Sequence, residues 1–153
     1  MYQKILVPLD GSKLAECVLP HVEVIAKGCG NPTIVYLRVV EPFNFGAGGG
    51  EWVPSSEQLA KFESQSREEA QSYLAQIAGQ YRGLNIKSAV VSGKSADAIA
   101  EYAGKNAVDL IVIATHGRSG MSRWVWGSVA DRILRSSCVP VLMVRAPGCV
   151  SGI

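Results

Sequence analysis

The sequence predicts an α/β protein: a single-domain, doubly wound sandwich with a five-stranded, mainly parallel sheet and four helices. Short β-branched runs alternate with longer segments of helical periodicity along the whole chain. Two of the runs, LIVIA and VPVLMV, are apolar without a break, as expected of strands that a parallel sheet buries on both faces. With 153 residues, of which 48% are hydrophobic, the chain has the size of one domain with a substantial core.

The first strand and the first helix occupy the N-terminal 28 residues. Lys4–Leu9 is the strand, and the Asp-Gly pair that follows is typical of a turn. A helix is predicted from a cap at Ser12 to Gly28, because apolar residues recur there every three or four positions. Pro20 lies inside this segment, so the helix either kinks there or places the proline where a missing amide donor is tolerated.

The second strand and the second helix are separated by a glycine-rich segment. Thr33–Val40 is the strand, and 43–54 is expected to be a flexible surface loop because it shows little periodicity. Ser55 and Ser56, followed by glutamate and glutamine, indicate a capped helix start, and the helix extends to about Tyr81.

The remaining elements continue the alternation. They are the strand Ile86–Val91, the helix Ser95–Lys105, the strand Leu110–Ala114, the helix Gly127–Ser136 and the strand Pro140–Val144. The domain is therefore expected to cover 1–146, with a short tail at 147–153. In such sheets a ligand binds beyond the carboxyl ends of the strands, where the strand order reverses. The segments that follow the first and fourth strands, at Asp10 and at 114–117, are the places to expect a site.

Composition and charge argue against several classes of protein. The net charge is +2, and the 15 lysines and arginines are scattered, so no nucleic-acid surface is predicted. No apolar stretch approaches the roughly 20 residues of a membrane span. The N-terminal apolar run breaks at Pro8 and Asp10, unlike a signal peptide, and we expect a cytoplasmic protein. Free thiols, without a zinc set, are expected at Cys17, Cys29, Cys138 and Cys149.

The junction ATHGRSGMSRWVWGSV, from Ala114 to Val129, indicates an anion site. Gly117 and Gly127 would let backbone amides approach an anion, and Ser128 adds a hydroxyl at a helix start. Arg118 and Arg123 could complement negative charge or be solvated surface. An ordinary strand-to-helix turn explains the same residues about equally well.

Two familiar phosphate motifs do not match. SGKS at 92–95 resembles the end of a P-loop, but Ser88 stands where the first glycine is required. The dinucleotide fingerprint GxGxxG is missing after the first strand. His116 has no carboxylate or nucleophile beside it in the sequence, and no residue is assigned a catalytic role.

Four segments together carry a resemblance to a known family. KILVPLDGS, ATHG followed by nine residues and GS, VADRILRSS and CVPVLMVR resemble the nucleotide-binding branch of the universal stress protein family. The hallmark of that branch is G-x-x-G, nine residues, then G-S or G-T. Gly117, Gly127 and Ser128 match it, whereas Ala114 replaces the first glycine.

The resemblance implies a Rossmann-like fold of the adenine nucleotide alpha-hydrolase type and a nucleotide site. Asp10 would face the ribose and adenine, Val39 the adenine edge, and Ser128 the outer phosphates. The implied nucleotide-binding residues are Pro8, Leu9, Asp10, Val39, Ala114, Gly117, Arg118, Ser119, Gly120, Gly127, Ser128 and Val129. Mg²⁺ or Mn²⁺ would accompany the nucleotide, held by phosphate oxygens and water, since no carboxylate cluster is visible.

The predicted function is that of a universal stress protein that binds ATP at the glycine-rich loop and uses occupancy or slow hydrolysis as a signal. One alternative is a stress protein that binds AMP or no nucleotide and works through protein contacts. Another is an ATP-hydrolysing or nucleotidyl-transfer enzyme of related fold, although LDGSK is too short for the SGGxDS-like loop of that class. The resemblance and the apolar last strand, Val139–Val144, both predict a homodimer.

Overall fold

The computed structural model describes residues 1–42, 55–115 and 128–146. The predicted loop at 43–54, most of the predicted phosphate loop at 116–127 and the tail at 147–153 lie outside these residues. Five strands form one sheet, in which all neighbouring pairs are parallel. They are β1 (Lys4–Pro8), β2 (Thr33–Val40), β3 (Asn85–Ser92), β4 (Leu110–Thr115) and β5 (Val141–Arg145). The predicted fold class is therefore confirmed.

The order of the strands places the switch point of the sheet between β1 and β4. The order is β3-β2-β1-β4-β5, so the chain moves outward from β1 in one direction and then crosses over to continue on the other side. Ile5 pairs with Leu110 and Leu6 with Ile111 across this central junction. The carboxyl ends of β1 and β4 are thus neighbours, as the expected location of a ligand site requires.

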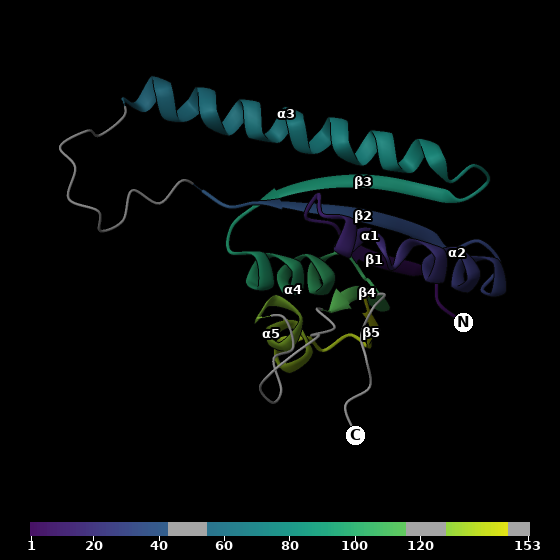
Figure 1. The fold of residues 1–153 in the computed structure, drawn as a ribbon. Coiled ribbons are helices and arrows are strands. Elements are labelled where there is room, and N and C mark those ends of the chain that lie inside the picture. The colour runs from purple at the N-terminus through teal and green to yellow at the C-terminus, as the bar shows by residue number, and fades with distance from the viewer. Residues whose placement is uncertain (43–54, 116–127, 147–153) are drawn as a thin grey trace.

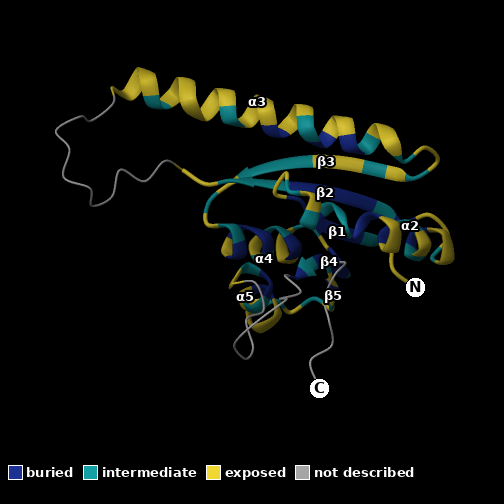
Figure 2. Cartoon of the chain, in the orientation of Figure 1, coloured by how far each residue is buried: buried dark blue, intermediate teal, exposed yellow. Residues whose placement is uncertain are grey.

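The helices form two layers, one on each face of the sheet (Figure 1). On one face lie α1 (Lys13–Glu16), α2 (Leu19–Gly28) and α3 (Ser56–Gln80), and on the other lie α4 (Ser95–Lys105) and α5 (Ser128–Ser136). Each layer closes its own cluster of buried side chains. Successive residues of β1 alternate between them: Ile5 and Val7 face the first layer and Leu6 the second. The sheet is dark blue at its centre in Figure 2 because both faces are covered.

The first predicted helix is wrong in one respect, because the structure divides it into α1 and α2. Pro20 occupies the first turn of α2, where the missing amide has no acceptor within the helix in any case. Of the two possibilities for Pro20, the tolerated position is therefore the one observed. Ser12 caps α1, since its side chain accepts a hydrogen bond from the Ala15 amide at 3.1 Å.

The start of α3 agrees with its predicted cap. Ser55 and Gln58 form a reciprocal capping box, in which each side chain accepts a hydrogen bond from the backbone amide of the other. Only the C-terminal half of the helix packs on the sheet, through Ala70, Leu74 and Ile77. Its N-terminal half is exposed (Figure 2).

Two further properties concern membranes and thiols. Within the described ranges, no helix combines the length and the apolarity that a bilayer crossing needs. Cys17, Cys29 and Cys138 are free thiols, as expected, and Cys149 lies outside the described residues.

Candidate functional site

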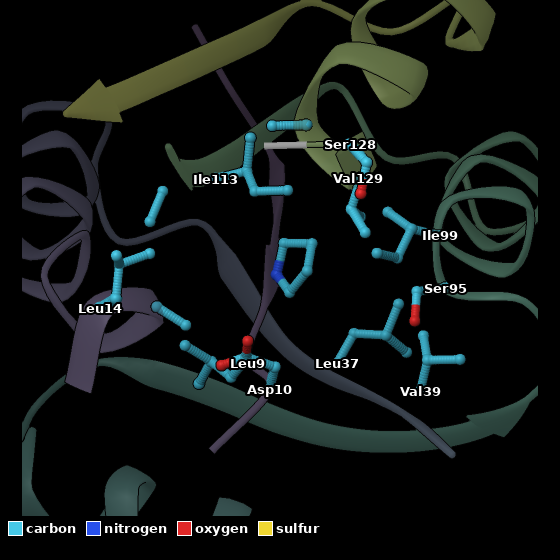
Figure 3. A pocket seen from close by; sticks show the side chains of 14 residues that line it. Leu9, Asp10, Leu14, Leu37, Val39, Ser95, Ile99, Ile113, Ser128 and Val129 are labelled. Carbon is cyan, nitrogen blue, oxygen red and sulfur yellow. The ribbon is translucent and has the colours of Figure 1, made fainter. Parts of the chain in front are cut away.

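A cavity of about 210 Å³ opens at the carboxyl ends of the central strands (Figure 3). Its lining includes every described residue that was implied to contact the nucleotide: Pro8, Leu9, Asp10, Val39, Ala114, Ser128 and Val129. These residues come from four separate segments of the sequence, and the sheet order brings them together. The other implied residues, Gly117, Arg118, Ser119, Gly120 and Gly127, lie outside the described residues.

Half of the lining was not predicted. The additional residues are Leu14, Ala15, Leu37, Ser95, Ile99, Ile113 and Ala130. Most are apolar and look like ordinary core in the sequence. Leu37 had a usable signal, because it lies two residues before Val39 and therefore on the same face of β2. No sequence signal marked Ser95 and Ile99 as lining residues, since only the packing of α4 over this face of the sheet brings them to the cavity.

The interior of the cavity is mainly apolar, with polar groups at its rim. Leu37, Val39 and Ile99 form one apolar wall, and Ile113 lies across the cavity from Val39 (Figure 3). Asp10 is the one titratable side chain among the described lining residues. An apolar ring system with hydrogen-bond donors at its edge suits this cavity, because ligand pockets combine apolar walls with a few polar groups that fix the orientation of the ligand.

Asp10 is held in a tight turn at the end of β1. Its Oδ1 accepts hydrogen bonds from the Ser12 amide at 2.9 Å and from Ser12 Oγ at 2.6 Å. Both hydrogen bonds from Ser12 therefore end on the same carboxylate oxygen. Asp10 is therefore a turn residue, as its Asp-Gly pair predicts, and neither Ser12 hydrogen bond uses Oδ2, which can accept a hydrogen bond from a ligand.

The environment of Asp10 favours its charged form. Partial burial by itself would raise the pKa of the Asp10 carboxyl, but the two hydrogen bonds from Ser12 and the charge of Arg38 outweigh burial and hold this pKa below its ordinary value. Asp10 is thus anionic at neutral pH and can only accept hydrogen bonds there. It suits an amine or a hydroxyl group of a ligand.

Ser95 fixes the start of α4 beside the end of β2. Its amide and its Oγ both donate to Glu41 Oε1, at 3.2 Å and 2.6 Å. These hydrogen bonds lower the pKa of the Glu41 carboxyl. Gly93, just before the helix, also donates its amide to the Val40 carbonyl at 3.1 Å. The Ser95 hydroxyl proton is committed to Glu41, so toward the cavity this side chain offers acceptor lone pairs.

The N-terminal end of α5 supplies the groups that an anion needs. Ser128 begins the helix and Val129 and Ala130 follow, and all three line the cavity. The first amides of a helix have no partner within it and carry partial positive charge, so a helix start attracts anions. Buried Ile133 anchors α5 to the sheet, and an ion pair of 3.0 Å between Arg132 and Asp97 joins it to α4.

The described part of the cavity is small, with a volume of about 210 Å³. Its volume is below the roughly 300 Å³ at which small-molecule pockets usually begin, so it can enclose only part of a nucleotide-sized ligand. Among the described residues, no cluster of three histidine, cysteine, aspartate or glutamate side chains could hold a metal ion.

Fold and site together define a doubly wound α/β protein with a polar-rimmed cavity at its switch point. The chain matches the model of the universal stress protein family over residues 1–145, and it belongs to this family. Universal stress protein MJ0531 of Methanocaldococcus jannaschii is 35% identical, with 96% of this chain and 84% of the relative covered.

Solved structures show the same fold. Protein MJ0577 of the same organism has a TM-score of 0.75 and 25% identity, covering 97% of this chain and 99% of that one. A universal stress protein family protein from Arabidopsis thaliana, solved with AMP bound, has a TM-score of 0.67 at 14% identity, covering 95% and 93%.

Proposed function

We propose that this protein binds an adenine nucleotide, with ATP as its main ligand, and acts as a nucleotide-dependent stress-response or signalling module in the cytoplasm. The observation that carries the proposal is the convergence of seven implied residues, from β1, β2, β4 and α5, on one cavity. The AMP bound to the Arabidopsis relative supports the same class of ligand.

Each part of the nucleotide has a matching part of the site. The adenine lies in the apolar part of the cavity beside Val39, and Asp10 Oδ2 accepts a hydrogen bond from an amine or a ribose hydroxyl. The phosphates point toward the start of α5 at Ser128, because anions favour a helix N-terminus. The glycines at 117 and 127 would hold the outer phosphates, and Mg²⁺ or Mn²⁺ would accompany them through phosphate oxygens and water.

Hydrolysis, where it occurs, is slow in this proposal. Efficient phosphoryl transfer needs a group that positions or activates the attacking water. Asp10, the one titratable side chain of the described lining, lies at the base and ribose end of the proposed nucleotide. The protein therefore responds mainly to occupancy. Ala114 provides the alternative in which AMP is preferred, since its methyl group lies where the hallmark glycine would leave more room.

Calorimetric titration with ATP, ADP and AMP tests the proposal, together with mass spectrometry of any ligand released from the purified protein. Ser128→Ala combined with Gly127→Val is expected to abolish ATP binding while the fold is kept. The matched control is Ser136→Ala combined with Gly104→Ala. It changes the far end of α5 and an open position on α4. Undiminished ATP affinity in the first variant would refute the site, and tighter binding of AMP than of ATP would favour the alternative.

The protein assembles, in this proposal, as a homodimer through its last strand. β5 is the edge strand beside β4, and an uncovered apolar edge invites pairing with a second copy. Leu142 on β5 and Leu134 on α5 are 38% and 47% exposed, so both side chains are accessible to a second copy. A contact between two copies of this edge would cover both.

A further inference from the structure

Arg38 lies behind the proposed nucleotide site, on the other face of the sheet. It follows Leu37 and precedes Val39 on β2, and because side chains alternate along a strand it points away from the cavity that those two residues line. Its guanidinium instead lies over the ring of Tyr73 on α3, 5.9 Å from the ring centroid. It therefore cannot touch a ligand in the cavity directly.

The guanidinium of Arg38 nevertheless contacts the turn that carries Asp10. Its Nη1 makes a long hydrogen bond of 3.5 Å to the Leu9 carbonyl, and the Leu9 amide donates to the Leu37 carbonyl at 2.9 Å. Both backbone groups of Leu9 are thus held by β2. A Cβ atom at Gly11 would lie 3.1 Å from the same Nη1, so the turn rests directly on the guanidinium.

Tyr73 restrains the guanidinium from the side of α3. The Tyr73 hydroxyl donates to Glu16 Oε1 at 3.3 Å, and Glu16 pairs with Lys13 at 2.7 Å. Burial, with the negative charge of Glu16, raises the pKa of Tyr73 to about 12, so its hydroxyl stays protonated at neutral pH. A planar cation between an aromatic ring and a backbone turn has little freedom, and lysine does not reproduce that geometry.

Among the described residues, three elements contribute titratable groups near the turn that carries Asp10. Arg38 on β2 contributes the positive charge that stabilises the anionic form, while Glu16 and Lys13 on α1 largely neutralise one another and Tyr73 on α3 is uncharged. Within 1–42, 55–115 and 128–146, Arg38 is the cation that both contacts this turn and stabilises the Asp10 carboxylate through its charge.

The space behind Arg38 makes its role testable. A second cavity, of about 390 Å³, is lined by Arg38, Gly11 and Tyr73, with Glu69 at its edge. A shorter or uncharged side chain at position 38 would therefore open onto solvent-accessible space and would leave no sealed void in the core. Variants at this position are expected to fold.

We propose that Arg38 is a positioning residue of the nucleotide site, which fixes the turn from Leu9 to Ser12 from the far face of the sheet and so holds the Asp10 carboxylate in place. The inference rests on the proposed function for the identity of the ligand. It makes nucleotide affinity depend on a residue that lines a different cavity, on the side of the sheet that α3 covers.

The test compares Arg38→Met and Arg38→Lys with the matched control Arg67→Met. Arg67 is an exposed arginine on α3 that contacts β3 instead, with its Nη2 3.3 Å from Ser92 Oγ. In the ligand-free proteins, the Asp10 carboxyl is titrated by carbon NMR from about pH 6 down to about pH 2, a range that extends well below the pKa of an ordinary aspartate. ATP affinity is then measured by calorimetry at neutral pH and in acid, and the comparison of variants at each pH cancels the titration of ATP itself.

Arg38→Met is expected to raise the pKa of Asp10 and to weaken ATP binding about three- to tenfold at neutral pH, with a larger loss in acid. Arg38→Lys keeps the charge but not the planar contact, so the titration of Asp10 should stay near that of the wild type while ATP affinity still falls. Arg67→Met should change neither quantity.

Unchanged ATP affinity in Arg38→Met, or changes no larger than those of Arg67→Met, would overturn the positioning role. If the wild type binds no adenine nucleotide at all, the proposed function fails. The Asp10 titration in the ligand-free protein still decides the inference in that case: an unmoved curve in Arg38→Met overturns it, and an upward shift upholds it.

Discussion

Replacing Gly11 with alanine has two expected effects, a loss of stability from backbone strain and a loss of ATP affinity from displacement of the turn that holds Asp10. Gly11 has a φ of +86°, a left-handed conformation that costs an alanine about 1–2 kcal/mol. In a protein of this size, each kcal/mol corresponds to a fall in Tm of about 2–4 °C, so Tm should fall by about 2–8 °C. The added Cβ would also lie 3.1 Å from Arg38 Nη1, and the guanidinium, as the end of a flexible side chain, would shift by a few tenths of an ångström.

Gly30→Ala is the matched control for this experiment. Gly30 has a φ of +75°, and a Cβ there would meet nothing within 4 Å. Thermal unfolding should therefore show a similar loss of stability in both variants. Calorimetric titration with ATP should show weaker binding in Gly11→Ala alone, because only that substitution displaces Arg38 and the turn that holds Asp10.

Two outcomes would refute this reasoning. Equal ATP affinity in Gly11→Ala and Gly30→Ala would show that the contact between the turn and Arg38 does not matter to the site. An unchanged Tm in Gly11→Ala would show that the left-handed turn is not required. If Gly11→Ala is instead much less stable than Gly30→Ala, the shift of Arg38 is costly, and combining Gly11→Ala with Arg38→Met should recover the difference.

Three other predictions concern the core, a helix cap and the edge of the sheet. Ile133→Ala should cost about 2–5 kcal/mol in denaturant unfolding because Ile133 is fully buried, whereas Leu134→Ala, at a side chain 47% exposed, should cost well under half of that; equal losses would contradict the assigned packing of α5. Hydrogen bonds lower the pKa of Glu41, so its stabilisation is present above the ordinary carboxyl pKa and is lost as the pH falls through the lowered one. Glu41→Gln should therefore lower Tm at neutral pH but not in acid, and a Tm difference that persists in acid would exclude this ionic cap. Leu142→Lys should convert a dimer to a monomer in light scattering at micromolar concentration, while Val24→Lys, at a 71% exposed site on α2, should not; a wild type that is already monomeric would refute the proposed assembly.

Local sequence signals account for the elements and for much of the site. The uninterrupted apolar run of β4 predicts a strand covered on both faces, and four of the five residues in that run are buried. Ser55 with Gln58 marks the start of α3 through a hydrogen-bonding pattern complete within four residues. Asp10 and Ala114 could be placed at one site from sequence because carboxyl ends of parallel strands meet at the same edge of a sheet.

The helix break and half of the cavity could not be predicted in the same way. Pro20 has no backbone N–H, and this is compatible either with a kink inside one helix or with the first turn of a new helix. Only the packing of α2 on the sheet decides between the two. Ser95 and Ile99 belong to α4. The amphipathic pattern of this helix predicts that it packs on the sheet but does not predict which strands it contacts. The crossover to α4 determines that these two residues face Val39.

The sequence by itself determined the periodicities, the caps and the order of strands and helices along the chain, because these depend on contacts between residues a few positions apart. It also carried the resemblance to the universal stress protein family, which the family match over residues 1–145 confirms. Only the tertiary structure decided which strand ends are neighbours and which face each side chain of β2 presents to which helix. Those relations join residues far apart in the chain, such as Leu9 with Arg38, and the burial of both faces of one sheet selects them.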